Sequence, residues 1–168
     1  MILLSATNDY SCALACLVSI AHDCGVATTQ DAILADPFYT PLFPHWQAAP
    51  GKLNECGDPD ISDAREISKH LGIATARRLL YNKGEIIEAM RSPTTAGAIL
   101  CTANYYDENG VVQPKRHHAM RITEVTEHGF TAMNPGRNGA VRLEDHPWTD
   151  LALYGGYIVL LESPATNP

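Results

Sequence analysis

The strongest constraint on the fold is the segment SCALACLVSIAHDC, residues 11–24, which places apolar side chains on almost every side of a helix. A helix that is apolar all round is stable in water only when other elements cover it, so we expect it at the centre of a domain. Asn8 and Asp9 are helix-capping residue types ahead of it, and Gly25 is a stop signal after it. With 168 residues the chain is long enough to enclose this helix, and we expect residues 1–168 to form a single domain.

The rest of the chain shows apolar periodicities of helices and strands, separated by glycine and proline stops. Helices are predicted at residues 30–35, 62–71 and 84–91, the second of them closed by Gly72. Strands are predicted at 73–80, 96–103, 117–125, 129–134 and 157–162. Because helices come first and a run of strands follows, the sequence predicts an α+β domain. Residues 37–60 are rich in proline and aromatic residues without either period, which predicts an ordered, irregular loop that packs over something.

Composition argues against several classes of partner. The formal net charge is −7 and no basic run occurs, which disfavours nucleic-acid binding. The longest apolar stretches, such as residues 13–21 and 157–161, are far shorter than the roughly 20 residues of a membrane span. The opening MILLSATNDY lacks the regions of a standard secretory signal peptide, so we expect a cytoplasmic protein or one exported by a non-classical route.

Three of the five cysteines lie within the apolar helix, and position separates them. Cys12 is at the helix N-terminus, where unpaired backbone N–H groups and the helix dipole can lower a thiol pKa from about 8.5 to roughly 3.5–7.5. Cys16 is one turn further in, and Cys24 is at the opposite end. Cys56 and Cys101 are interpreted as a loop thiol and a core residue. An odd cysteine count argues against a disulfide framework, so Cys12 is the candidate nucleophile.

A thiolate nucleophile needs a base and a group that orients the base. Strand alternation puts His118 on the apolar face of the segment HHAMRITEV, whereas His117 is expected to face solvent beside Arg121. One hairpin later, Asn134 would lie near the level of His118 and accept its imidazole N–H. Taken singly, His118 can be a structural histidine and Asn134 part of a plain Asn-Pro-Gly turn.

Two motifs then carry a family resemblance. DYSCALACL resembles the nucleophile helix of papain-like cysteine peptidases of the bacteriocin-processing, double-glycine leader type, and HHAMRITEVTEHGFTAMNP resembles their base strand and hairpin. The segments DAREISKHLGI and GAILCTA fall where that family has comparable elements, so the similarity runs from about residue 8 to residue 162. The resemblance implies a papain-like fold with the nucleophile helix packed on an antiparallel sheet. It assigns Cys12 as nucleophile, His118 as base and Asn134 as its orienter, with no cofactor.

The chain departs from the family pattern around the nucleophile. Ala13 follows the cysteine where the family usually has glycine, and Ala6 stands where it has the glutamine of the oxyanion hole. Asn8 is the nearest amide side chain, and it is either a replacement oxyanion donor or only a helix cap. Trp148 either shields the His118–Asn134 hydrogen bond from water or packs as an ordinary core aromatic.

The leading functional hypothesis is a cysteine peptidase that hydrolyses a peptide bond in a protein or peptide substrate. The alternatives are an acyl transferase or deamidase that uses the same Cys-His pair, and an inactive peptidase-like binding module. A structural metal site made of Cys12, Cys16, His22 and Cys24 is disfavoured, because zinc modules need close Cys-x-x-Cys pairs on turns.

Two biological roles fit the peptidase hypothesis. Leader peptidases of this family are commonly fused to an ABC transporter, and no membrane span occurs in this sequence. A free-standing domain can process a leader peptide for a separate exporter. It can also be a toxin or effector protease held in check by an immunity protein, with the 37–60 loop selecting the target. The large loop and the missing transporter favour the effector role.

Overall fold

The computed structural model describes residues 1–6, 12–38, 61–79, 82–106, 111–113, 118–136 and 140–163. The helices in these ranges are α1 (Cys12–Asp23), α2 (Gln30–Ala35), α3 (Ile61–His70), α4 (Lys83–Arg91) and α5 (Asp150–Tyr154). The strands are β1 (Thr75–Leu79), β2 (Thr95–Thr102), β3 (Tyr105–Tyr106), β4 (Val112–Gln113), β5 (His118–Val125), β6 (Gly129–Pro135), β7 (Val141–Pro147) and β8 (Gly156–Glu162). The predicted α+β class is confirmed.

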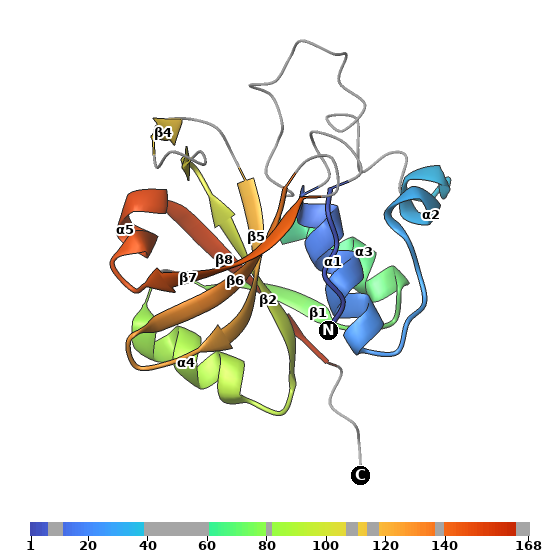
Figure 1. The fold of residues 1–168 in the computed structure, drawn as a ribbon. Helices are drawn as coiled ribbons and strands as arrows, with labels where there is room; N and C mark the ends of the chain where they lie inside the picture. The colour runs from blue at the N-terminus through green and yellow to red at the C-terminus, as the bar shows by residue number, and fades with distance from the viewer. Residues whose placement is uncertain are drawn as a thin grey trace.

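The main sheet has six strands in the order β1-β8-β2-β5-β6-β7, and every neighbouring pair is antiparallel. Strands β3 and β4 form a separate short pair. Figure 1 shows α1, α2 and α3 on one side of the main sheet and α4 and α5 on the other. The strand predicted at residues 96–103 is β2, and it lies in the interior of the sheet between β8 and β5.

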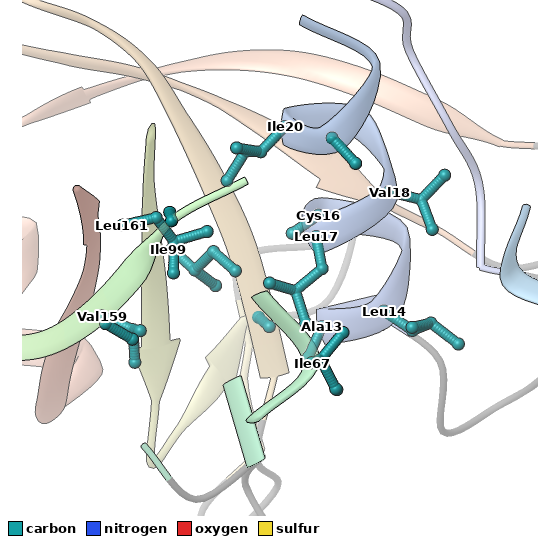
Figure 2. Packing of buried hydrophobic residues seen from close by; sticks show 14 of the residues in the cluster. Ala13, Leu14, Cys16, Leu17, Val18, Ile20, Ile67, Ile99, Val159 and Leu161 are labelled. Atoms are coloured by element: carbon teal, nitrogen blue, oxygen red, sulfur yellow. The ribbon is translucent and has the colours of Figure 1, made fainter. Parts of the chain in front are cut away.

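The apolar helix predicted near the N-terminus is α1, and its side chains from Ala13 to Ala21 are all buried. Figure 2 shows Leu17 and Ile20 directed toward the sheet residue Ile99. Burial of one such side chain contributes about 1.5–3 kcal/mol, so the helix and this face of the sheet stabilise each other. The capping types at residues 8 and 9 lie outside the described residues.

Glycine ends α1 and α3 in the same way. Gly25 has a φ of 81°, its N–H donates to the carbonyl of His22, and the next N–H, from Val26, donates to the carbonyl of Ala21. Gly72 has a φ of 68° and closes α3 with the equivalent pair of bonds. Glycine adopts this left-handed conformation without steric cost, which confirms both predicted stops.

The two faces of the sheet carry separate apolar clusters. Strand residues such as Cys101, Ala119 and Met133 pack with α1 and α3, whereas Met120 and Ala132 pack with α4 and α5. The odd-numbered residues at the start of β5 therefore face α1, and the even-numbered residues face the other layer. The cluster between α1 and the sheet also includes the partly buried Cys12 and Val141, among others.

The predicted exposure of Arg121 is wrong. Its side chain is 6% exposed and donates to Ser19 Oγ and Asp23 Oδ2 of α1, both at 2.6 Å. Alternation along β5 separates two faces but does not show that a helix covers the more polar one. His117, its expected neighbour, lies outside the described residues.

Strand β7 and helix α5 are absent from the sequence prediction. In the segment VRLEDHP the buried residue is His146, whereas Leu143 is 50% exposed, so the apolar pattern indicates the wrong face.

The plain-turn interpretation of Asn134 is also wrong, because β6 continues through Pro135 and pairs there with Val141. Most of the predicted loop, residues 39–60, lies outside the described residues. None of the helices in the described ranges is long and apolar enough to cross a membrane.

Candidate active site

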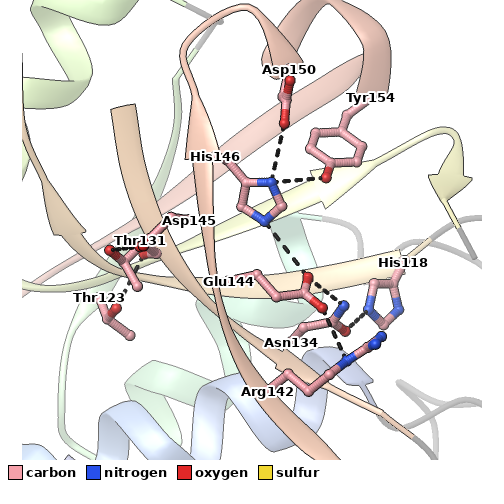
Figure 3. Close-up of polar contacts among 10 residues, drawn as sticks. All are labelled: His118, Thr123, Thr131, Asn134, Arg142, Glu144, Asp145, His146, Asp150 and Tyr154. Carbon is pink, nitrogen blue, oxygen red and sulfur yellow. Dashed lines mark hydrogen bonds and ion pairs between the residues drawn. The ribbon is translucent and has the colours of Figure 1, made fainter. Parts of the chain in front are cut away.

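His118 and Asn134 lie in contact on neighbouring strands. His118 is the first residue of β5, and Asn134 is the penultimate residue of β6. The hairpin between them pairs Arg121 with Met133 and Ile122 with Ala132, which brings the start of one strand beside the end of the other. As a result, His118 Nε2 lies 2.7 Å from Asn134 Oδ1 (Figure 3). Asn134 is only 4% exposed, so surrounding protein shields most of this amide from water.

A carboxylate lies on the other side of the Asn134 amide. Asn134 Nδ2 donates to Glu144 Oε2 at 2.9 Å, and Arg142 Nε lies 3.0 Å from Glu144 Oε1. The pKa of Glu144 is lowered, first by the neighbouring His146 ring and then by the hydrogen bond from Asn134 and the charge of Arg142, against an opposing effect of burial. Glu144 is therefore ionised at neutral pH and accepts hydrogen bonds without donating any.

Further polar groups continue this network away from His118. His146 Nε2 lies 3.7 Å from Glu144 Oε2, and His146 Nδ1 lies 3.2 Å from Asp150 Oδ2 and 3.1 Å from the Tyr154 hydroxyl. Burial opposes a charge on His146, but the nearby carboxylate of Glu144 and the hydrogen bond and charge of Asp150 outweigh it and raise the pKa of the ring. A chain of polar contacts thus leads from α5 through β7 and β6 to the first residue of β5 (Figure 3).

Cys12 opens α1 at the same end of the sheet. Arg121, three residues into β5, contacts Ser19 and Asp23 in the second half of α1. Strand β5 begins at His118 and helix α1 begins at Cys12. Figure 1 shows that the two elements begin at the same end of the molecule. Cys12 is partly exposed and packs on the cluster that includes Ala119, the residue after His118.

The other described cysteines are thiols of a different kind. Burial, followed by the neighbouring Cys12 and Cys101, raises the pKa of Cys16 well above its usual value. Burial and the charge of Asp23 also raise the pKa of Cys24, which remains exposed. Cys101 is 1% exposed, as expected of a core residue. Cys56 lies outside the described residues.

Ala6, which the sequence analysis aligned with an oxyanion-hole glutamine, contacts the segment just after Asn134. The Ala6 N–H donates to the carbonyl of Gly136 at 3.3 Å, two residues beyond Asn134, and Ala6 is 7% exposed. A methyl side chain offers no hydrogen-bond donor. Asn8, the predicted substitute, lies outside the described residues and its role stays a prediction.

Trp148 does not cover the His118–Asn134 contact. Its Nε1 donates to the carbonyl of Thr126 at 3.0 Å, and its ring lies 5.5 Å from that of Phe130. Thr126 follows the last residue of β5, and eight residues at about 3.3 Å each separate it from His118 by roughly 26 Å. The shielding interpretation is wrong, and Trp148 packs on the α4–α5 side of the sheet.

The disfavoured zinc ligands do not gather in space. Cys12 and Cys24 lie at opposite ends of α1, roughly 18 Å apart at 1.5 Å per residue, and His22 Nε2 contacts the carbonyl of Thr28 at 2.7 Å. Within the part of the chain that the structure describes, no group of three or more His, Cys, Asp or Glu side chains is arranged to hold a metal ion.

The sequence prediction missed Glu144 and the residues behind it, His146, Asp150 and Tyr154. One signal could have identified them. Arg142, Glu144 and His146 recur at every second position after a predicted base strand and hairpin, which is the spacing of one strand face.

No protein-family model matches this sequence, and no curated protein matches it either.

Proposed function

We propose that this protein is a papain-like cysteine peptidase with Cys12 as nucleophile, His118 as general base and acid, and Asn134 as the residue that orients His118. The observation that carries the proposal is the 2.7 Å contact between His118 Nε2 and Asn134 Oδ1 at the end of the sheet where α1 begins. A helix packed on an antiparallel sheet, with the base and its orienter on adjacent strands, agrees with the papain-like resemblance.

The catalytic steps follow from these positions. With Nε2 turned to Asn134, Nδ1 is the ring nitrogen that accepts the proton of the Cys12 thiol. The thiolate attacks the peptide carbonyl carbon, and the imidazolium Nδ1–H then protonates the leaving amine as the C–N bond breaks. Water attacks the resulting thioester while Nδ1 takes one of its protons, and the proton returns to sulfur as the acid product leaves.

The placement of His118 defines where the pair has to meet. Ala119 and Arg121 face α1, so His118 belongs to the opposite face of β5. As the first residue of its strand, His118 lies at the end of the sheet, and the proposal requires its ring to meet the Cys12 thiol around that end. Cys12 lies at the first turn of α1, where the helix dipole and the unpaired N–H groups favour a thiolate.

The oxyanion hole distinguishes this protein from the family pattern. Ala6 cannot donate a side-chain hydrogen bond, so the Cys12 backbone N–H and the Asn8 amide are the proposed donors. Loss of one donor typically costs about 10²–10³ in kcat. This observation favours a second candidate, a peptidase-like binding domain that retains the dyad without turnover.

Alkylation by iodoacetamide at pH 6 tests whether Cys12 is the reactive thiol that both candidates require. An exposed thiol with a raised pKa, Cys24, provides an internal reference in the same molecule. We expect Cys12 to react at least about tenfold faster than Cys24 by site-resolved mass spectrometry, because a thiol with a lowered pKa holds a much larger thiolate fraction at this pH. Replacement of His118 by Gln should remove most of this advantage. Equal rates at Cys12 and Cys24 would overturn the assignment of Cys12 as nucleophile.

Product analysis then identifies the reaction. Co-expression of the wild type and of Cys12→Ala, with a proteome-wide search for new N-termini, should show cleavage products only with the wild type. The substrates identified this way also distinguish the two proposed roles. Cleaved leader peptides favour leader processing, whereas cleaved proteins of another cell favour an effector that an immunity protein inhibits. Mass gains of about 1 Da, or cross-links, in place of new N-termini would instead indicate a deamidase or transferase. A reactive Cys12 without any product would indicate the binding domain.

A further inference from the structure

The hydrogen bonds of Asn134 distinguish the two ends of its side-chain amide: the oxygen faces His118 and the nitrogen faces Glu144. The oxygen and nitrogen ends of an asparagine amide have nearly the same shape, so packing alone does not determine which end faces His118. Glu144 removes this ambiguity. Its Oε2 lies 2.9 Å from Asn134 Nδ2, and an ionised carboxylate repels the amide oxygen but accepts from the amide nitrogen.

The orientation of Glu144 is itself determined by its neighbours. Arg142 Nε lies 3.0 Å from one carboxylate oxygen, and the His146 ring lies 3.7 Å from the other. His146 is in turn held by Asp150 and the Tyr154 hydroxyl at its other ring nitrogen. The carboxylate therefore presents one oxygen to Asn134 from a fixed position.

The consequence reaches the His118 ring. With Nδ2 committed to Glu144, Asn134 presents only Oδ1 to His118, and this oxygen accepts a hydrogen bond. His118 Nε2 must then carry a hydrogen, and the neutral ring holds its lone pair on Nδ1. We propose that Glu144 is a positioning residue that selects the Nδ1-basic tautomer of His118 through Asn134. The catalytic importance of this tautomer rests on the proposed function, whereas the tautomer itself does not.

Imposing the wrong tautomer on a catalytic histidine is far more costly than allowing both tautomers. In hydrolases with a Ser-His-Asp triad, an imidazole held in the wrong tautomer lowers kcat by about 10⁴-fold. Here the substitution Glu144→Leu removes the bias without imposing the opposite one, so both tautomers should be populated. Glu144→Gln is the isosteric second variant, and since its amide can turn either end to Asn134 it should weaken the bias to an intermediate degree.

Asp145→Asn is the matched control. Asp145 is the next residue along β7, loses the same charge in this variant, and accepts a hydrogen bond from Thr131 Oγ1 at 2.7 Å on the other face of the strand. It makes no contact with Asn134 in the described structure, so it should leave the His118 tautomer unchanged.

The test uses two readouts on the folded protein. The ¹⁵N chemical shifts of the His118 ring, measured with Cys12→Ser in every form so that the ring stays neutral, report which nitrogen carries hydrogen. We expect mainly Nε2–H with Glu144 or Asp145→Asn, and a mixture with Glu144→Leu. The rate of Cys12 alkylation by iodoacetamide, measured across pH 5–9 with Cys12 present, should fall at pH 6 in Glu144→Leu in proportion to the fraction of the Nε2–H tautomer that is lost, and less in Glu144→Gln.

The two readouts distinguish failure of this inference from failure of the proposed function. A tautomer ratio that is unchanged by both Glu144→Leu and Glu144→Gln, or a main Nδ1–H form with Glu144 in place, overturns the role of Glu144. A tautomer that depends on Glu144 while Cys12 is inert in every form supports the positioning role and overturns the peptidase.

Discussion

Replacing Asn134 by aspartate would put a second carboxylate against Glu144. The amide nitrogen that donates to Glu144 Oε2 at 2.9 Å would become an oxygen at the same distance. Aspartate serves as the orienting residue in many catalytic triads, so the substitution tests the network and not only the triad. We expect Asn134→Asp to destabilise the protein and Glu144→Gln to rescue it, because the introduced glutamine amide would then donate to the new carboxylate.

The magnitude follows from the distance. Two unit charges 2.9 Å apart repel by about 6 kcal/mol at an effective dielectric constant of 20. Protonating one carboxyl with an ordinary pKa costs only about 4 kcal/mol at pH 7, so the pair would bind a proton instead of bearing two charges. Glu144 is 26% exposed, and water screens part of this cost. The expected loss for Asn134→Asp is therefore about 2–4 kcal/mol at pH 7.

Urea unfolding of the four forms of the double-mutant cycle measures this effect. Glu144→Gln alone should cost about 1–2 kcal/mol, and the coupling energy between the two sites should be at least about 2 kcal/mol in the stabilising direction. The raised pKa of the folded carboxyl pair means that stability is lost as pH rises, so Asn134→Asp should approach the wild type near pH 4.5. A loss below about 1 kcal/mol at pH 7, with no rescue, would refute the inferred orientation of the Asn134 amide.

Two further predictions concern the layers that support the site. Glu144 and the other partners of His146 raise its pKa above 6.5 in spite of burial. The charged ring therefore stabilises the fold fully below about pH 6.5, and this stabilisation is lost as pH rises through the pKa of the folded state. The stability difference between the wild type and His146→Gln, from urea unfolding, should be largest near pH 6 and shrink toward pH 9; a pH-independent difference would contradict it. In the other layer, a Cβ at Gly97 would lie 2.7 Å from Ile20 Cγ1, so Gly97→Ala should cost about 1–3 kcal/mol by overpacking α1 against β2. Gly84→Ala, on the exposed surface of α4, is the control and should leave Tm unchanged or raise it, whereas equal shifts in both variants would contradict the close approach.

Local features of the sequence were sufficient for much of the fold. The apolar character of α1 identified it as buried, and Gly25 and Gly72 marked helix ends because only local conformational preference is involved. The pairing of β5 with β6 was predictable because a tight hairpin links neighbouring segments. The proximity of His118 and Asn134 follows from this hairpin, and their geometry is therefore close to what the sequence predicted.

The burial of polar residues whose partners lie far away in the sequence could not be predicted from local features. Arg121 was expected at the surface, yet its partner Ser19 is 102 residues earlier in the chain. Glu144 and His146 occupy the inner face of an edge strand, where apolar periodicity assigns the wrong side. Alternation groups Arg142, Glu144 and His146 on one strand face, but nothing in the local sequence indicates that this face packs on the protein or which groups compensate its charges.

By itself, then, the order of residues determined the central helix, the α+β class, the hairpin and the candidate pair on it, because each depends on local conformation or on apolar periodicity. Tertiary structure alone decided which face of β5 is covered by α1, that Trp148 lies far from His118, and that Asn134 donates a hydrogen bond to Glu144. The physical reason is that burial of a polar group is tolerated only when partners are brought to it, and those partners come from elements that the chain supplies elsewhere.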